Sequence, residues 1–369
     1  MSQMPSPPAA IRREDFSVSA AVAGFLAVLI SYCGPLVIFI QAAQAGGMSP
    51  AMLSSWIWAI SIGAGVSGLV LSLWLRQPII TAWSAPGTAL LLSLFPHITM
   101  AEVVGAYLMA AALVIAIGIT GTFEKIVDRI PKGIAAGMMA GILFQFGTQA
   151  FRASMELPTV VFAMLAAYLL GKRWLPRYAI VLVALTGLAV AVATGSTRLD
   201  TLALVTARPV FTAPVFDAGV FLSFTVPLLM VSLTGQYLPG MAVLRLAGYR
   251  TPSRAVVTGT GLASMLVACF GGITIVLASI TAALCTGKEA HPGPGEREVA
   301  GGANGVFSLV GSTFAGSIVL VFSAFPPALI AALAGLALIG AIVSNLALMA
   351  QDGTSTEPAV IAFLATASG

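Results

Sequence analysis

The fold of this chain is decided by the stretch Gln77-Pro78-Ile79-Ile80-Thr81-Ala82-Trp83-Ser84-Ala85-Pro86-Gly87-Thr88. The stretch is apolar enough for a membrane interior, yet Pro86 has no backbone N–H and Gly87 is a poor helix former. A second broken apolar segment follows in the other half of the chain: Phe270-Gly271-Gly272-Ile273-Thr274-Ile275-Val276-Leu277-Ala278-Ser279. In membrane proteins, a matched pair of interrupted segments is the best sequence indication of a substrate site.

The composition is that of a membrane protein. Hydrophobic residues make up 59% of the 369 residues and charged residues only 8%, whereas about 25% of the residues in soluble domains are charged. No Asp, Glu, Lys, Arg or His occurs in 16–75 or in 299–351. Each run is long enough for two spans of about 20 residues. The net charge of +4 comes from basic residues scattered among the loops, so it does not indicate a nucleic-acid partner.

The pattern predicts an all-α polytopic protein with thirteen visible spans. We expect them near 18–44, 51–74, 78–94, 102–121, 131–150, 156–171, 178–195, 218–247, 253–270, 272–286, 301–323, 326–350 and from 357 onward. Gly34-Pro35 should kink the first span. The apolar end of the sequence, 359–369, is too short for a span, so we expect the sequence to end inside a membrane segment.

The basic residues predict the orientation. Fourteen of the 17 Lys and Arg residues fall in alternate loops that start with the N-terminus, and the other loops hold only Arg152, Arg198 and Arg208. This bias favours a cytoplasmic N-terminus. The polar, proline-rich start of the chain does not resemble a cleaved signal peptide.

A weak internal repeat relates the two halves. Gln44, Ser49-Pro50 and the first broken segment form one series, and Gln236, Thr251-Pro252 and the second broken segment form another. An odd number of spans separates them, so the halves should be inverted in the membrane.

A helix that starts near Pro86 would present free N–H groups and a positive dipole end to a cavity, which suits a carboxylate. The break at Gly271-Gly272 would add a second such end. A simple kink for helix packing is the alternative reading of Ser84–Thr88.

Several polar or aromatic residues within spans are candidates for substrate contact. Gln236 and Tyr237 lie between Gly235 and Pro239, and a buried amide needs a partner. A hydrogen bond between helices is the alternative for Gln236 and for Gln44. Tyr32 lies in the first span, where it would stack on a ring or pack in the core.

Acidic residues are missing from the middle of every predicted span, although proton-coupled carriers usually hold an intramembrane carboxylate or histidine. His97 and Glu102, at span ends, are therefore the candidates for proton coupling. No nucleophilic triad, acid–base pair or metal-like cysteine spacing is present. We expect no enzyme, no metal and no cofactor.

The chain resembles the benzoate membrane transport protein family, BenE, over nearly its whole length. The resemblance is carried by Gln41-Ala42-Ala43-Gln44-Ala45-Gly46, Ser55-Trp56-Ile57-Trp58-Ala59, Thr81-Ala82-Trp83-Ser84-Ala85-Pro86-Gly87, Thr234-Gly235-Gln236-Tyr237-Leu238-Pro239-Gly240, Val243-Leu244-Arg245, Glu289-Ala290-His291-Pro292 and Glu357-Pro358-Ala359. It implies secondary import of benzoate or a similar aromatic carboxylate by proton symport, in the cell (inner) membrane. It also implies distant kinship with nucleobase and sulfate-type carriers, which have 14 spans in two inverted repeats of seven and often dimerise.

That kinship implies a core domain and a gate domain, with short third and tenth spans that frame the substrate. We assign 1–15 to a cytoplasmic tail, 16–121 and 218–323 to the core domain, 122–195 and 324–369 to the gate domain, and 196–217 to an external loop. The nucleobase relatives carry acids in the eighth and tenth spans, where this chain has Gln236 and Thr274. This departure fits an anionic substrate. The alternatives are an anion channel or uniporter on the same fold, or a carrier of another small organic anion.

Overall fold

The structure is a computed structural model that describes residues 18–95, 97–197, 203–287, 290–291, 293–351 and 356–368. The predicted tail over 1–15, together with Arg198, Glu289 and Pro292, lies outside these residues. Within the described part, six helices are long and apolar enough to cross a membrane, and a seventh span arises if one bent pair is counted as a single span. The predicted polytopic helical class is therefore confirmed, whereas the count of thirteen spans stays a prediction.

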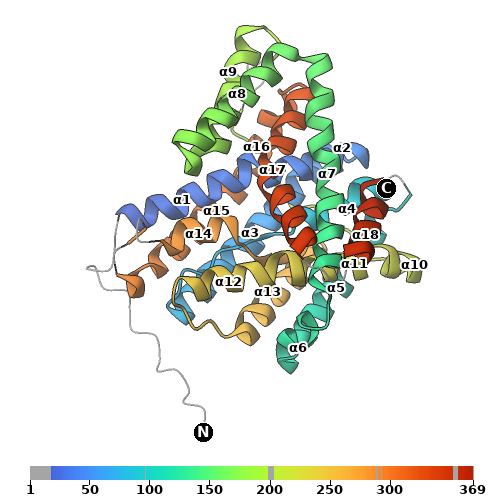
Figure 1. Ribbon diagram of the computed structural model, residues 1–369, viewed down its shortest axis with the longest axis vertical. Coiled ribbons are helices and arrows are strands. Elements are labelled where there is room, and N and C mark those ends of the chain that lie inside the picture. The colour runs from blue at the N-terminus through green and yellow to red at the C-terminus, as the bar shows by residue number, and fades with distance from the viewer. Residues whose placement is uncertain are drawn as a thin grey trace.

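In the described part of the first half of the chain, the regular elements are helices and one short strand (Figure 1). Gly34 breaks the first span, because Pro35 begins α2 and has no N–H to offer the preceding turn; the predicted kink is thus confirmed. The elements are α1 Val18–Cys33, α2 Pro35–Ala45, α3 Pro50–Leu75, β1 Thr81–Trp83, α4 Ala85–Leu94, α5 Met100–Thr120, α6 Phe123–Val127, α7 Lys132–Glu156, α8 Pro158–Trp174, η2 Pro176–Tyr178 and α9 Ala179–Ala193.

The second half contains a long helix with two π-helical turns, a second strand and a bent pair. The axes of α15 and α16 differ by 69° at the break between them. The elements are α10 Ala218–Val220, η3 Phe221–Thr225, α11 Val226–Ser232, η4 Leu233–Tyr237, α12 Leu238–Leu246, α13 Ser253–Ala268, β2 Ile275–Leu277, α14 Ile280–Thr286, η5 Pro294–Glu296, α15 Glu298–Thr313, α16 Ala315–Ser323, α17 Pro327–Gln351 and α18 Thr356–Ser368.

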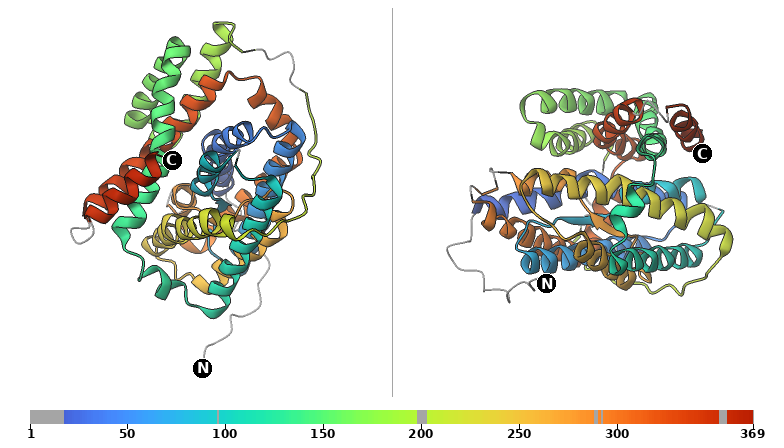
Figure 2. Two further views of the ribbon diagram at one scale, coloured as in Figure 1. Left: turned by 90° about the vertical axis from the view of Figure 1, so that its right-hand side faces the viewer. Right: turned by 60° about the horizontal axis from the view of Figure 1, so that its bottom comes forward.

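The helices form two groups. Helices α7, α8, α9, α17 and α18 pack on one another and lie as one layer over the rest of the molecule (Figure 2). In the other group, α3 packs on α15 and α13, and α5 packs on α13. The short helix α6 contacts α13 and η4 of this second group, although its residues fall within the range 122–195 that we assigned to the gate domain.

Glycines on α7 permit the close packing of the first group. A Cβ at Gly137 would lie 2.2 Å from the carbonyl oxygen of Ala359 in α18. A Cβ at Gly141 would come just as close to Thr366 of the same helix. Only a residue without a side chain lets the two backbones approach to this distance, as in other membrane helix pairs.

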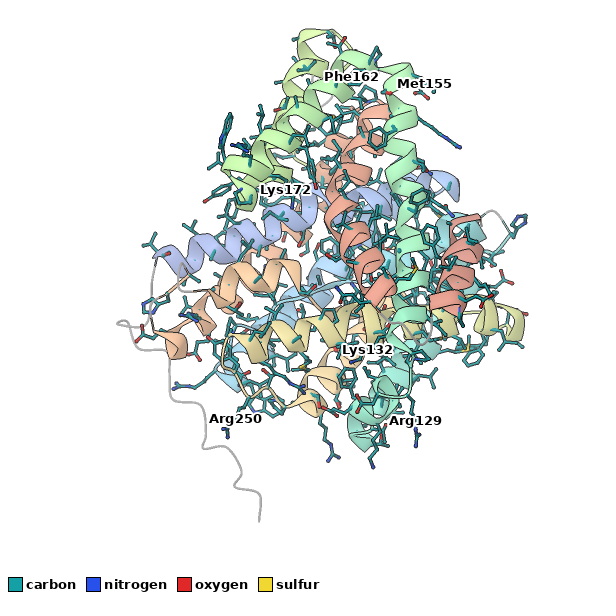
Figure 3. All side chains as sticks on the ribbon, in the orientation of Figure 1. Arg129, Lys132, Met155, Phe162, Lys172 and Arg250 are labelled. Carbon is teal, nitrogen blue, oxygen red and sulfur yellow. The ribbon has the colours of Figure 1, made fainter. Side chains whose placement is uncertain are left out.

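Basic residues gather at one end of α7. Figure 3 shows the helix running from Lys132 at its lower end to Met155 at its upper end, with Arg129 below Lys132. Arg250, from the connection between α12 and α13, lies toward the same lower edge of the molecule. The loops to which Arg129 and Arg250 belong were both predicted to face the cytoplasm.

Candidate functional site

The two broken segments meet at the centre of the second helix group. Strands β1 and β2 pair antiparallel, with Ala82 opposite Val276. The backbone N–H of Ser84 donates to the carbonyl of Thr274 at 3.0 Å, so the two segments stay side by side beyond the strands. The structure therefore brings together the two segments that were predicted to form one site.

The helix in the first segment begins where it was predicted, although residues 81–83 before it form the unpredicted strand β1. Ser84 is the N-cap of α4, and its Oγ accepts a hydrogen bond from the N–H of Gly87 at 3.1 Å. The hydroxyl of Thr88 donates back to the carbonyl of Ser84 at 2.9 Å, and residues 84–88 are all buried. The helix thus begins at Ala85, with its positive dipole end inside the protein.

The second segment differs from the prediction of a helix end at Gly272–Thr274. Helix α13 ends at Ala268 and α14 begins only at Ile280. Residues 275–277 form β2 instead, because this run is rich in the β-branched residues that suit a strand and finds its partner in β1. The hydroxyl of Thr274 is buried and has no hydrogen-bond partner.

A turn at Gly271 leads into this segment. Its φ of +86° lies in the left-handed region that favours glycine, and a Cβ there would be 1.9 Å from Cδ1 of the Trp56 ring. Trp56 is fully buried and packs edge-on against Phe39. The indole of α3 therefore lies directly against the backbone that enters the site.

Two aromatic rings lie at the end of β1. Tyr32 stacks on Trp83 with 5.9 Å between the ring centroids, and the Tyr32 hydroxyl is 2.7 Å from the Oγ of Ser61. The indole nitrogen of Trp83 is buried and has no hydrogen-bond partner. The sequence analysis proposed Tyr32 as a site residue but not Trp83. Its position directly before the proposed site residue Ser84 could have indicated Trp83 as a further candidate.

Gln236 and Tyr237 lie in the π-helical turn η4, which packs on β2 and on α7. The side-chain oxygen of Gln236 is buried without a partner. The hydroxyl of Tyr237, in contrast, pairs with that of Thr260 at 2.6 Å and donates to the carbonyl of Ile275 at 3.1 Å. Tyr237 therefore braces β2 from the side of α13.

The remaining candidates lie elsewhere. Gln44 lines a separate cavity of about 190 Å³ between the end of α2, the start of α3 and α16. His97 is exposed beyond the far end of α4, which separates it from Ser84 by about 15 Å at 1.5 Å per residue. Glu102 caps α5: its carboxylate accepts hydrogen bonds from the N–H and the hydroxyl of Thr99, both at 2.7 Å.

Comparisons with known proteins agree with one another. The model of a family described as benzoate membrane transport protein matches residues 14–369. A benzoate membrane transport protein of Acinetobacter baylyi is 54% identical over 97% of this chain and 91% of its own length. The inner membrane protein YdcO of Escherichia coli is 37% identical over 94% of this chain and 89% of its own length.

Two solved structures share the fold at low sequence identity. The transmembrane domain of the cyanobacterial bicarbonate transporter BicA matches with a TM-score of 0.64 and 17% identity, over 96% of this chain and 99% of that chain. The murine Slc26a9 anion transporter in its inward-facing state matches with a TM-score of 0.65 and 14% identity, over 97% of this chain and 66% of that chain.

Proposed function

This chain belongs to the benzoate membrane transport protein family, and on that premise we propose that it imports benzoate or a similar aromatic carboxylate through the cell membrane. It is a multi-pass membrane transporter and not an enzyme.

The substrate carboxylate binds at the first turn of α4, beside the paired strands. The observation that carries this placement is a set of buried polar atoms without partners, which belong to Trp83, Gln236 and Thr274. Trp83 lies in β1, Thr274 directly precedes β2, and Gln236 lies in η4, which packs on β2. An unsatisfied buried polar group costs about 1–3 kcal/mol, so a bound anion that accepts hydrogen bonds from the Trp83 N–H and the Thr274 hydroxyl is stabilised by both. The unpartnered atom of Gln236 is its amide oxygen, which only accepts hydrogen bonds, so Gln236 contributes to anion binding through its side-chain N–H groups.

The aromatic ring of the substrate packs on apolar neighbours of the same site. Tyr32 offers a ring face beside Trp83, and Ile273 is fully buried next to Thr274. Neither broken segment contains an acid, so nothing in 77–88 or 270–279 repels a carboxylate. These features favour an anionic aromatic substrate over a neutral nucleobase.

Transport proceeds by alternating access, in which the layer of α7–α9, α17 and α18 moves as a gate domain against the other helices. Small residues line the contact between the two groups. A Cβ at Gly34 would meet Ala337 of α17 at 3.3 Å, and a Cβ at Gly235 would meet Met139 of α7 at 2.4 Å. The two glycines thus allow the helices of the two groups to approach closely. The natural arrangement is two inverted seven-span repeats, with a cytoplasmic N-terminus and a homodimer as the assembly.

Proton symport needs a proton carrier, and the central site offers no acidic side chain in either broken segment. The proton travels on the substrate carboxylate, or through His97, Glu102 or water. Uniport or channel conduction of the anion is the alternative mechanism, because neither needs a group that carries a proton.

Uptake of radiolabelled benzoate into proteoliposomes, with and without an inward proton gradient, separates these mechanisms. Concentrative uptake that requires the gradient and is abolished by a protonophore supports symport. Equilibrating uptake that ignores the gradient supports the uniporter or channel. Absence of benzoate uptake would refute benzoate as the substrate. Gln236→Ala tests the site, because unaltered uptake and affinity would remove Gln236 from it.

A further inference from the structure

The connection between α9 and α10 forms a strap over the ends of five helices. We define the strap as residues 203–217, which contain no helix or strand. Its backbone bonds to helix ends at five places: Val205 to Ser317, Ala207 to Thr313, Val210 to Ser55, Thr212 to Cys269 and Val215 to Ala101. The strap is thus attached along its length to α16, α15, α3, α13 and α5.

One of these attachments continues into the proposed substrate site. The Oγ of Ser55 accepts a hydrogen bond from the N–H of Val210 at 2.8 Å and donates one to the carbonyl of Phe270 at 2.9 Å. Ser55 is fully buried in the first turns of α3. A single hydroxyl therefore joins the strap, α3 and the residue that precedes the turn at Gly271.

The neighbours of Ser55 hold the same turn. Trp56 lies against Gly271, as described above, and Trp58 packs edge-on against the ring of Phe270 with 5.4 Å between centroids. The N–H groups of Gly271 and Gly272 donate to the carbonyls of Ala268 and Val267 at the end of α13, at 2.9 and 3.0 Å. Ile273 and Thr274 follow outside any helix or strand, so their positions depend on the residues around the turn.

We infer that Ser55 is a positioning residue for substrate binding, which acts through the carbonyl of Phe270 to set the second half of the site. The path runs from Phe270 along the backbone to Thr274, whose carbonyl accepts the N–H of Ser84 at the cap of α4. This inference rests on the proposed function for its effect on affinity. Its effect on the geometry of 271–274 does not depend on the identity of the substrate.

Ser54 supplies a matched control on the same helix. Its hydroxyl is also buried, but it has no hydrogen-bond partner. Ser55→Ala and Ser54→Ala thus make the same chemical change one residue apart, and only the first removes a link to Phe270. Val210→Pro deletes the N–H donor from the strap and leaves α3 intact, which gives a second variant should Ser55→Ala fold poorly.

The test combines hydrogen exchange on the full-length protein with benzoate titration calorimetry and uptake kinetics. In Ser55→Ala, amide exchange over 271–274 should rise and the Kd and KM for benzoate should rise about tenfold, with a smaller change in maximal rate. Ser54→Ala should change none of these. Val210→Pro should shift exchange and Kd in the same direction as Ser55→Ala but less, because the Ser55 hydroxyl keeps its bond to Phe270 and loses only the strap N–H that orients it.

Two results in Ser55→Ala would overturn the inference. The first is unchanged amide exchange over 271–274. The second is faster exchange at Val210 with an unchanged Kd for benzoate, which would mean that Ser55 only holds the strap. If the unaltered protein binds no benzoate, the proposed function fails on its own. Faster exchange over 271–274 would then still support the positioning role, and unchanged exchange would refute it.

Discussion

Gly271→Ala should destabilise the protein by about 2–5 kcal/mol. An alanine with a φ near +86° costs about 1–2 kcal/mol from its backbone conformation alone. The added Cβ would also lie 1.9 Å from the ring of Trp56, which is fully buried and cannot swing aside. Overpacking of this kind costs about 1–3 kcal/mol. The free energy of unfolding, measured by circular dichroism during a denaturant titration in mixed micelles, reports the sum.

Gly248→Ala separates the two contributions. Gly248 has a φ of +90°, but a Cβ there would meet nothing within 4 Å. Its replacement should therefore cost only the conformational part, about 1–2 kcal/mol. In a Trp56→Ala background, Gly271→Ala should cost no more than Gly248→Ala does. The reasoning is refuted if Gly271→Ala and Gly248→Ala are equally destabilising in the unaltered background.

Three further substitutions test the site. Thr274→Val removes a buried hydroxyl without a partner, so the free energy of unfolding should stay unchanged or rise by about 1 kcal/mol while the KM for benzoate rises; an unchanged KM would exclude this hydroxyl from binding. Tyr237→Phe takes a donor from the carbonyl of Ile275, and thermal unfolding should show a loss of about 1 kcal/mol; unaltered stability would contradict the bracing role. Ser84→Ala removes the oxygen that accepts the N–H of Gly87, so the free energy of unfolding should fall by about 0.5–2 kcal/mol and benzoate binding in calorimetry should weaken. Unchanged stability and affinity would show that the cap contributes to neither.

Sequence reasoning succeeded where one residue decides the local structure. Proline lacks an N–H, so the breaks at Gly34-Pro35 and before Pro86 could be placed from the sequence within a residue or two. The strands could not be placed in this way. A short apolar run such as 79–83 suits a buried helix or a strand equally well. Its partner decides the outcome, and that partner lies far along the chain.

The orientation of neighbouring side chains could not be predicted from the sequence either. Gln236 and Tyr237 were predicted to share one site, but successive residues on a helical turn point in different directions. In the structure, the Gln236 side-chain oxygen has no hydrogen-bond partner, whereas the Tyr237 hydroxyl bonds to the Thr260 hydroxyl and to the carbonyl of Ile275. Gln44 was placed in the central site for a similar reason: its cavity is formed with α16, and no sequence pattern indicates that α16 lies beside it.

The pairing of β1 with β2 has a consequence for biosynthesis. Ala82 and Val276 are 194 positions apart. At about 5–20 residues per second, a ribosome needs roughly 10–40 s to make the second strand after the first. During that time the first strand has no sheet partner, and exposed backbone groups are costly in lipid. The nascent chain must keep this segment in the insertion machinery or against its own helices until the partner arrives, so the site is assembled late in synthesis.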